Sequence, residues 1–313
     1  MHKDTRILVT GSNGMVGSAL VRRLKYLGFT TVLTPTSKDL DLRNQEAVDE
    51  YFATHDINYV FHLAAKVGGI KANINFSAEF LYDNIIMGCN VINSARKYGV
   101  KKLLFLGSSC IFPKNCRQPM KETDIMTGPL EPTNEGYAFG KLSILKMCEM
   151  FNKQFGTNFI SLMPCNIYGI GDHFDLERSH VMGALITKFH NAKINNLPSV
   201  EIWGSGKAKR EFIFVDDVID AIMFFMTKCN AQDIIPFVNI GTGTDVTINE
   251  LAHLISSVVG YKGKIVFNKD KPEGMMRKCL DVIKANKLGW KANVKLMDGL
   301  EKTYEWYIKN ESK

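Results

Sequence analysis

The chain has 313 residues, 45% of them hydrophobic, and a formal net charge of +7 at pH 7. This length and composition predict a globular protein with a sizeable core, in one large or two modest domains. No apolar run reaches membrane-spanning length, and the basic residues are dispersed rather than interleaved with aromatic residues. We therefore expect no membrane segment and no nucleic-acid partner, while the mild positive charge suits anionic ligands such as nucleotide phosphates.

The N-terminus leads directly into the apolar residues 7–9, a run too short for the core of a signal peptide. Seven cysteines, an odd number, are scattered without C-x-x-C pairs. This pattern predicts a reduced, cytoplasmic protein with neither a disulfide framework nor a metal site.

The first half of the chain alternates short apolar runs with stretches of helical periodicity. The expected strands cover residues 7–10, 30–33, 59–63, 102–106 and 159–163. The expected helices cover residues 18–27, 46–55, 78–98 and 137–155. This alternation predicts an α/β fold with a doubly wound parallel sheet of the Rossmann type, covered by helices on both faces.

After Pro164 the rhythm loosens, and residues 171–180 are polar and loop-like. The expected helices are 181–192, 216–226, 249–259 and 297–309, and the expected strands are 201–203, 210–215, 236–240 and 264–268. We predict a smaller mixed α/β region interleaved with the first. The division is a dinucleotide-binding domain of residues 1–165 and 212–240, and a substrate-binding domain of residues 166–211 and 241–313.

A glycine-rich turn lies between the first expected strand and the first expected helix. Its spacing, G-x-x-G-x-x-G, is one residue longer in the first turn than the usual dinucleotide fingerprint. Glycines there allow a tight turn and let a pyrophosphate approach the positive end of the helix. The alternative is a glycine turn without a ligand, which its place between strand and helix disfavours. The expected cofactor contacts are Gly11, Asn13, Gly14, Met15, Val16 and Gly17.

The segment after the second expected strand bears on the choice of cofactor. A carboxylate there would favour a free ribose 2′-hydroxyl, and Asp39 argues weakly in that direction. Ser37 and Lys38 suit a 2′-phosphate instead. We therefore expect NADP(H).

Tyr137 and Lys141 are four residues apart and share one face of an expected helix. A lysine cation near a phenol favours the phenolate and lowers the tyrosine's pKa from about 10. A tyrosine tuned in this way transfers protons at neutral pH. Taken alone, the pair also fits a chance exposed helical pair.

The glycine turn, the Tyr137/Lys141 pair and the upstream Ser108 together resemble the extended short-chain dehydrogenase/reductase family over nearly the whole chain. Further segments make the resemblance more specific: 64–70, 107–113, 131–135, 179–181 and 271–274. They are similar to the members that epimerise GDP-4-keto-6-deoxy-D-mannose at C3 and C5 and then reduce C4 with NADPH. Epimerisation must come first, because the hydrogens beside a ketone lose their acidity once the ketone is reduced.

The resemblance implies a role for each catalytic residue. Tyr137 protonates O4, Lys141 lowers its pKa and binds the nicotinamide ribose, and Ser108 hydrogen-bonds O4. Cys110 and His180 are the base and acid on opposite faces of the sugar. Ala64 and His180 are expected beside the cofactor. Ser109 competes with Ser108 for the hydroxyl role; on a strand, Ser108 and Cys110 would face the same side.

For the nucleotide half, the resemblance implies contacts from Asn166, Lys188, Trp203, Arg210 and Lys278. From the residues alone, Trp203 fits a core position and Lys278 a solvated charge. Two positions depart from the family pattern. Asn13 stands where some members carry an arginine for the 2′-phosphate, and Lys188 replaces an arginine, keeping the charge without the bidentate geometry.

Two other functions were weighed. A related 4-epimerase or dehydratase would hold NAD, but a dehydratase has an Asp-Glu pair where this chain has Ser109-Cys110, and a 4-epimerase needs no Cys/His pair. A catalytically silent NADP-binding regulator is disfavoured because Tyr137 and Lys141 are both present. The resemblance also implies a homodimer formed by the helices 78–98 and 137–155.

Overall fold

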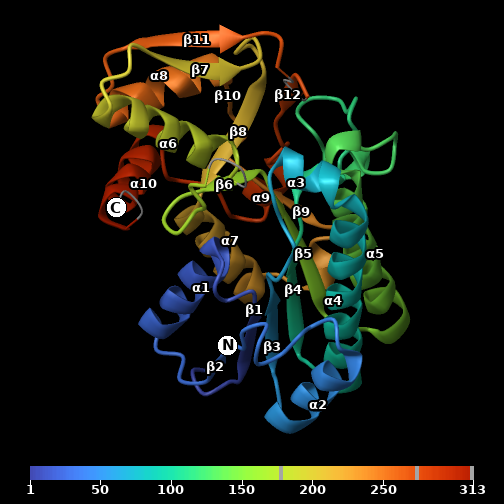
Figure 1. The fold of residues 1–313 in the computed structure, drawn as a ribbon. Helices are drawn as coiled ribbons and strands as arrows, with labels where there is room; N and C mark the ends of the chain where they lie inside the picture. Colours follow the sequence, from blue (N-terminus) through green and yellow to red (C-terminus); the bar gives the residue numbers. More distant parts are fainter. Residues whose placement is uncertain (176–178, 272–274, 311–313) are drawn as a thin grey trace.

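The computed structural model describes residues 1–175, 179–271 and 275–310. Parts of two segments from the sequence analysis, the loop 171–180 and the segment 271–274, lie outside these described residues. The described chain forms a large parallel sheet between helical layers, with a smaller mixed region beyond one end of it (Figure 1). Within it, no helix has both the length and the apolar character needed to cross a membrane.

The larger sheet has six parallel strands in the order β2-β1-β3-β4-β5-β9. Its central strands are almost entirely buried, as expected for a parallel sheet between two layers of helices. The first five strands have a doubly wound order whose switch point lies between β1 and β3, so the predicted fold class is confirmed. The strands are β1 (Ile7–Thr10), β2 (Val32–Leu33), β3 (Tyr59–His62), β4 (Lys102–Leu106), β5 (Phe159–Pro164) and β9 (Val238–Ile240).

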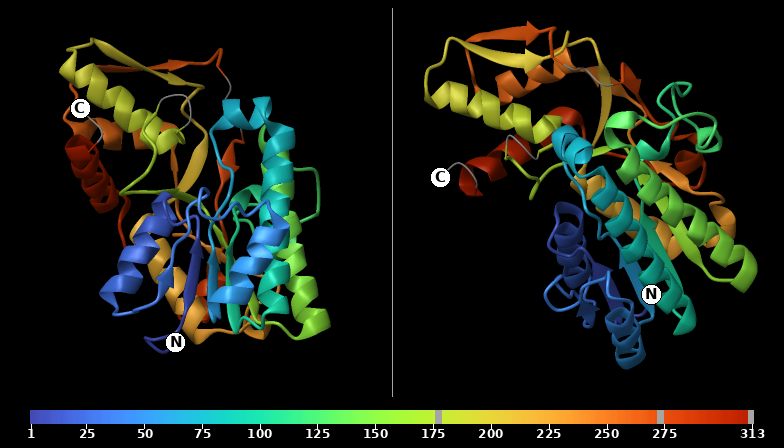
Figure 2. Two further views of the ribbon diagram at one scale, coloured as in Figure 1. Left: turned by 60° about the horizontal axis from the view of Figure 1, so that its bottom comes forward. Right: turned by 45° about the vertical axis from the view of Figure 1, so that its right-hand side comes forward.

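Helices cover both faces of this sheet. On one face α1 contacts α7; on the other α4 lies between α2 and α5 (Figures 1 and 2). The helices are α1 (Met15–Tyr26), α2 (Gln45–His55), α3 (Ile70–Asn75), α4 (Ser77–Lys97), α5 (Glu135–Phe155) and α7 (Val215–Lys228). Helix α1 begins three residues earlier than expected, directly after the N-cap Gly14, so its first turn belongs to the glycine motif itself.

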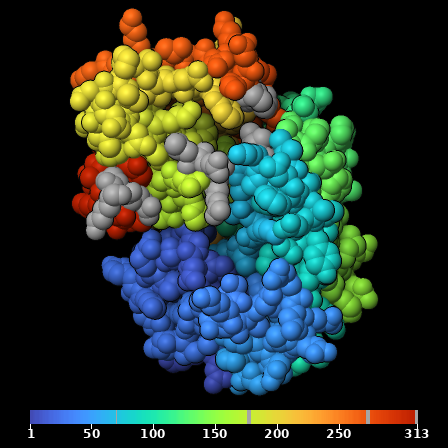
Figure 3. Space-filling view, in the orientation of Figure 1, coloured from blue at the N-terminus to red at the C-terminus, as the bar shows by residue number. Residues whose placement is uncertain are grey.

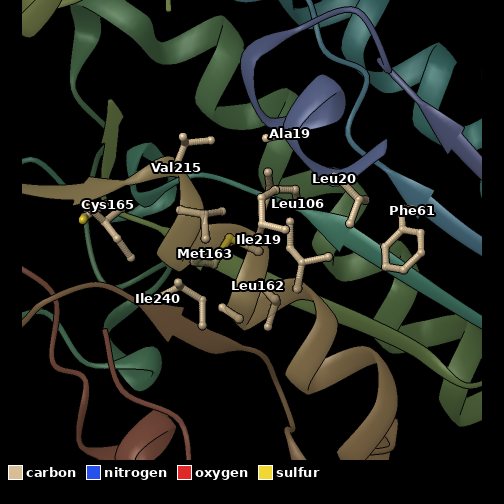
Figure 4. Packing of buried hydrophobic residues seen from close by; sticks show 14 of the residues in the cluster. Ala19, Leu20, Phe61, Leu106, Leu162, Met163, Cys165, Val215, Ile219 and Ile240 are labelled. Atoms are coloured by element: carbon tan, nitrogen blue, oxygen red, sulfur yellow. The ribbon is translucent and has the colours of Figure 1, made fainter. Parts of the chain in front are cut away.

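The core lies between the sheet and the helices. Figure 4 shows side chains of β4, β5 and β9, among them Leu106, Leu162 and Ile240, beside Val215 and Ile219 of α7. All five are less than a tenth exposed. Burial of such side chains contributes about 25 cal/mol per Å² of apolar surface, which makes this layer the main stabilising feature of the fold.

The smaller region contains a mixed sheet in which β8 is flanked by β10 and β12 and also pairs with β6, and a separate pair of β7 with β11. Its strands are β6 (Asn166–Tyr168), β7 (Ser199–Trp203), β8 (Lys209–Phe214), β10 (Asp245–Thr247), β11 (Lys264–Asn268) and β12 (Arg277–Lys278). Its helices are α6 (Val181–Ile194), α8 (Ile248–Val259), α9 (Ile283–Lys287) and α10 (Leu296–Asn310).

The chain crosses between the two regions more than once, as Figure 1 shows by the mixture of colours at the top. The predicted boundary between residues 211 and 212 falls inside β8, whose pairing partners all lie in the smaller sheet. The division into two domains stays a prediction.

The carboxyl ends of β1, β3 and β4 meet at the side of the sheet that faces the smaller region (Figure 1). In the space-filling view the surface is indented where the N-terminal part of the chain meets the yellow-green segments above it (Figure 3). Ligands of doubly wound folds bind outside the carboxyl ends of the strands, so this is where the candidate site is expected.

Candidate active site

The glycine turn closes tightly on the end of β3. Gly11 has a φ of +72°, and a Cβ there would lie 2.7 Å from the amide nitrogen of Ala64. A Cβ on Gly17 would lie 2.0 Å from the carbonyl oxygen of Gly11. These positions therefore require glycine, and the backbone forms a cradle that any side chain would fill.

The first turn of α1 points out of this cradle. Its N-cap, Gly14, provides no side-chain cap, and the turn contains no acidic residue. The first amide groups of a helix lack partners inside the helix and carry a partial positive charge. Asn13 is exposed, and Met15 and Val16 are half-buried beside them. This arrangement fits the pyrophosphate of a dinucleotide.

The segment after β2 presents the two side chains predicted for a 2′-phosphate. Ser37 and Lys38 are exposed. Asp39 accepts hydrogen bonds from the backbone nitrogen and the hydroxyl of Thr36, at 2.9 and 2.7 Å, and these bonds lower its pKa. The carboxylate of Asp39 is therefore engaged by Thr36, although it is exposed to solvent like Ser37 and Lys38.

A buried histidine that the sequence analysis did not single out ends β3. The hydroxyl of Thr10 lies 2.9 Å from Nδ1 of His62 and also accepts the amide of Ala64 at 3.3 Å. Burial lowers the pKa of His62 to about 3, and the nearby Lys141 acts in the same direction. A neutral ring whose Nδ1 accepts the Thr10 hydroxyl fits both contacts. The polar residues that end the apolar strands β1 and β3, Thr10 and His62, were the available signal.

Tyr137 and Lys141 share a face in the first turns of α5, as predicted. Lys141 is 4% exposed, and its Nζ donates to the carbonyl oxygen of Leu106 at 2.8 Å. The same nitrogen lies 6.0 Å from the centroid of the Tyr137 ring. Burial lowers the pKa of Lys141 to about 7, against the opposing effect of Cys110.

The expected direction of the tyrosine's pKa shift is wrong for this structure. Burial raises the pKa of Tyr137 above its ordinary value, the negative charge of a Cys110 thiolate adds to this rise, and a hydrogen bond with Ser108 opposes it. Lys141 directs its charge to Leu106 and is itself easily deprotonated. Tyr137 is therefore a protonated phenol at neutral pH.

Ser108 and Cys110 do not lie on a strand, so the expected strand alternation is wrong. Strand β4 ends at Leu106, and residues Ser109–Ile111 form a 3-10 turn. The hydroxyl of Ser108 accepts the backbone N–H of Cys110 at 3.3 Å and caps this turn. Both side chains are half-buried, whereas Ser109 is buried. The turn thus favours Ser108 over Ser109 for contact with a ligand.

The sulfur of Cys110 has two nitrogen neighbours. Nδ2 of Asn134 lies 3.3 Å from Sγ, and Nζ of Lys278 lies 3.4 Å from it. Asn134 belongs to the segment 131–135 but was not singled out as a site residue. Lys278, expected to touch the nucleotide, instead contacts a predicted catalytic residue.

His180 is the N-cap residue of α6; the residue as a whole is exposed, while its ring is closely surrounded by protein atoms. Desolvation lowers its pKa, and the positive charges of Lys278 and His173 lower it further. Lys278 is therefore near both Cys110 and His180. The structure brings together Ser108, Cys110, Tyr137 and Lys141, and it links His180 to this group electrostatically through Lys278.

Trp203 is not a core residue, because 57% of its surface is exposed at the end of β7. The ammonium groups of Lys188 and Lys271 lie 5.8 and 5.6 Å from the centroid of its ring. Lys188 also donates to the carbonyl oxygen of Glu201 at 3.2 Å, and burial lowers its pKa. An exposed indole between two cations is suited to a flat, anionic ligand.

Arg210 on β8 and Lys278 on β12 are paired residues of neighbouring strands and so point to the same side of the smaller sheet. Asn166 is tied to the same strand, because its Nδ2 donates to the backbone oxygen of Glu211 at 2.7 Å. The structure thus places Arg210, Asn166 and Lys278 on connected strands.

Glu211 is a further residue that sequence reasoning missed. It is completely buried and accepts the backbone N–H groups of Gly243 and Leu280, each at 2.7 Å. Burial raises its pKa to about 7. A Cβ at Gly241 would lie 2.2 Å from its carboxylate. This carboxylate joins the loops that follow β9 and β12, and so fixes the strand that carries Lys278.

Known proteins of similar sequence and structure agree with this geometry. Residues 7–241 match the NAD dependent epimerase/dehydratase family. The GDP-L-fucose synthase of Escherichia coli (strain K12) is 44% identical over 314 residues, covering 98% of both chains. A GDP-6-OMe-4-keto-L-xylo-heptose reductase from C. jejuni has a TM-score of 0.94 at 35% identity over 99% of both chains. A GDP-L-fucose synthetase from Naegleria fowleri bound to NADP has a TM-score of 0.89 at 27% identity, covering 100% of this chain and 96% of that one. The chain belongs to the NAD dependent epimerase/dehydratase family.

Proposed function

We propose that the protein converts GDP-4-keto-6-deoxy-D-mannose to GDP-L-fucose, by 3,5-epimerisation followed by NADPH-dependent reduction of the 4-ketone. The observation that carries the proposal is the thiol of Cys110 within the same group as Tyr137 and Lys141. A reductase alone needs the tyrosine and the lysine. A thiol held by nitrogen donors beside them supplies a base for the epimerisation.

NADP(H) is the cofactor that the residues of the cradle fit. The turn from Gly11 to Gly17 would hold the pyrophosphate, and Ser37 and Lys38 would contact the 2′-phosphate. Ala64, Lys141 and His180 are proposed to line the nicotinamide half. NADPH supplies the hydride that reduces C4.

In the epimerisation, Cys110 removes a proton from the carbon beside the ketone. The proton passes to Sγ, and the electron pair of the C–H bond becomes the enolate on O4, to which Ser108 and Tyr137 donate hydrogen bonds. His180 then returns a proton to the carbon from the opposite face, which inverts the centre. Cys110 then releases its proton to solvent and His180 takes one up from solvent, which restores both groups for the same exchange at the second carbon. Inversion at both C3 and C5 completes this stage.

In the reduction, Tyr137 gives its proton to O4. The raised pKa of Tyr137 supports this role, because a phenol that stays protonated at neutral pH is ready to act as a proton donor. Loss of this proton leaves Tyr137 as a phenolate. The buried Lys141, once protonated, stabilises that phenolate by its positive charge.

We assign the nucleotide half of the substrate to the smaller region. Arg210 would bind the pyrophosphate, with Asn166 and Lys278 close to it on connected strands. Trp203 and Lys188 would contact the base or ribose.

Product analysis tests the proposal. The purified protein is incubated with GDP-4-keto-6-deoxy-D-mannose and NADPH, and the sugar is identified by NMR. We expect GDP-L-fucose from the wild-type chain, and a Cys110→Ala variant that binds NADPH normally but forms none of it. An unepimerised GDP-6-deoxyhexose from the wild-type chain would instead indicate a plain 4-keto reductase, as the C. jejuni structure is named.

We further propose a cytoplasmic homodimer formed through α4 and α5. These helices lie against each other and carry exposed apolar side chains, including Tyr82, Phe139 and Met150. Light scattering tests the proposal: the wild-type chain should have twice the monomer mass, and Phe139→Asp should shift it toward the monomer. A wild-type mass of one chain would contradict it.

A further inference from the structure

Two donors from distant parts of the chain meet at the sulfur of Cys110. Nζ of Lys278 lies 3.4 Å from Sγ and comes from β12 in the smaller sheet. Nδ2 of Asn134 lies 3.3 Å from Sγ and comes from the 3-10 turn before α5. A neutral thiol is a weak acceptor, so two nitrogen donors around one sulfur favour the thiolate.

The electrostatic surroundings act in the same direction. The Lys278 side chain places a basic nitrogen beside the sulfur. Asn134 immediately precedes the N-terminus of α5, which is the positive end of that helix. Lys141 lies near enough for its charge to be coupled to that of Cys110. Tyr137 is the other ionisable side chain coupled to the sulfur, and it stays neutral.

We propose that Lys278 and Asn134 are positioning residues that hold Cys110 as the thiolate, the form able to remove the C3 and C5 protons. The inference rests on the proposed function for the identity of those protons. It gives Lys278 a role different from the nucleotide contact that the resemblance implied. It also gives a role to the segment 131–135.

Several contacts hold the 3-10 turn that carries Asn134. Glu131 accepts the backbone N–H and the hydroxyl of Thr133, at 3.4 and 3.3 Å, and faces Nζ of Lys114 at 3.4 Å. The start of α5 is seated closely on α4, because a Cβ at Gly136 would lie 2.3 Å from the carbonyl oxygen of Ser77. The backbone N–H of Asn134 also donates to the carbonyl oxygen of Glu131 at 3.1 Å, so the turn fixes the backbone that carries the Asn134 side chain.

Lys278 connects the thiolate to the rest of the epimerisation machinery. Lys278 is paired with Arg210 across β12 and β8. One pair of strands would therefore contact both the substrate pyrophosphate and the catalytic base, Cys110. The charge of Lys278 also lowers the pKa of His180, which makes the protonated ring a stronger acid. Lys278 thus favours the charged form of the base, whereas at His180 it favours the neutral ring, which gives up a proton readily after taking one up.

The pH dependence of Cys110 alkylation tests the inference without substrate. Iodoacetamide is added across a range of pH, and the Cys110 peptide is quantified by mass spectrometry, which separates it from the other six cysteines. We expect Lys278→Met to slow alkylation by about tenfold near neutral pH, because the sulfur loses its neighbouring cation, and the rates to converge at high pH. Asn134→Ala should slow it by about threefold, because it removes a neutral donor. Lys278→Arg should largely restore the rate.

Lys209→Met is the matched control, because Lys209 is an exposed lysine on the neighbouring strand β8. Its alkylation profile should coincide with that of the wild type. If Lys278→Met also coincides with the wild type, the inference is wrong. An unchanged alkylation profile together with a raised KM for the GDP-sugar would show that Lys278 contacts the nucleotide of the substrate instead.

Exchange of substrate hydrogens separates this inference from the proposed function. In D₂O without NADPH, the wild-type chain should exchange the hydrogens at C3 and C5, and Lys278→Met should do so about tenfold more slowly near neutral pH. Absence of exchange in the wild type would contradict the proposed function. The alkylation profiles would still decide whether Lys278 and Asn134 hold the thiolate.

Discussion

Lys141 joins the helix that carries Tyr137 to the end of a central strand: its Nζ donates to the carbonyl oxygen of Leu106, the last residue of β4, at 2.8 Å. The loop that carries Gly107, Ser108 and Cys110 follows this strand directly. One buried lysine therefore fixes the tyrosine, the strand end and the thiol loop relative to one another. Burial of Lys141 lowers its pKa to about 7, so this side chain gains and loses a proton near neutral pH. Burying the amine also reduces the stability of the folded chain.

We predict that Lys141→Met separates activity from stability. Reduction should slow by at least about 100-fold, because the phenolate of Tyr137 loses its neighbouring cation and the cofactor ribose loses a donor. The midpoint of thermal unfolding should not fall, since the variant no longer buries an amine. Enzyme assays and calorimetry measure the two effects. Unchanged activity with a large fall in the midpoint would show that Lys141 is structural.

Gly17→Ala should destabilise the protein by about 1–3 kcal/mol and weaken NADPH binding. The new Cβ would lie 2.0 Å from the carbonyl oxygen of Gly11, so the turn and α1 must separate. Gly14→Ala is the matched control for stability, because its Cβ would meet the same oxygen at 3.5 Å, an ordinary contact. Chemical denaturation measures the free energy of unfolding of both variants. Equal values would contradict the close contact between Gly17 and the carbonyl oxygen of Gly11.

His62 should make the protein sensitive to acid. Its pKa is about 3 in the folded chain and about 6.5 when unfolded, so between these values the unfolded chain binds the extra proton. Stability therefore falls as the pH drops through this window. In His62→Asn, the loss of unfolding free energy from about pH 6.5 to 4.5 should be about 2 kcal/mol smaller than in the wild type.

Urea titrations at the two pH values measure this difference. His253→Asn is the control, because His253 is exposed on α8, and its loss should equal that of the wild type. If His62→Asn lost as much stability in acid as the wild type, the buried neutral ring would not be the cause.

Lys38→Ala should reduce the preference for NADPH over NADH. The side chain is exposed beside the end of β2, where the charge would meet the 2′-phosphate, while Asp39 is held by Thr36. We expect the KM for NADPH to rise about tenfold and that for NADH to stay constant, since one charge-assisted contact is worth roughly 1.5 kcal/mol. Lys25→Ala, at an exposed position in the last turn of α1, should change neither value. Equal losses with both cofactors would refute the assignment.

The long elements were predictable because their hydrophobic periodicity reports directly on burial, as in β1, β4, α4 and α5. Strand β12 was not, because Arg277 and Lys278 have no pattern of their own and pair with β8 only in the folded chain. The 3-10 turn at Ser109 was missed because a turn of three residues is too short to show helical periodicity.

In the candidate site, too, some features were predictable from the sequence and others depend on the folded chain. Spacing selected the Tyr137/Lys141 pair, and the family resemblance added Ser108 and Cys110; the structure brings all four together. The direction of the tyrosine's pKa shift was wrong, because spacing cannot reveal that burial outweighs the nearby lysine. The contact of Lys278 with Cys110 joins residues far apart in the sequence, and only the folded chain places them together.

The central claim is that one pocket epimerises C3 and C5 and then reduces C4. The most direct test is to run the complete reaction in D₂O with unlabelled NADPH and to examine the product by NMR. We expect GDP-L-fucose with deuterium at C3 and C5 and with hydrogen from the cofactor at C4. A C4-reduced sugar that keeps the substrate's configuration and carries no deuterium at C3 or C5 would contradict it.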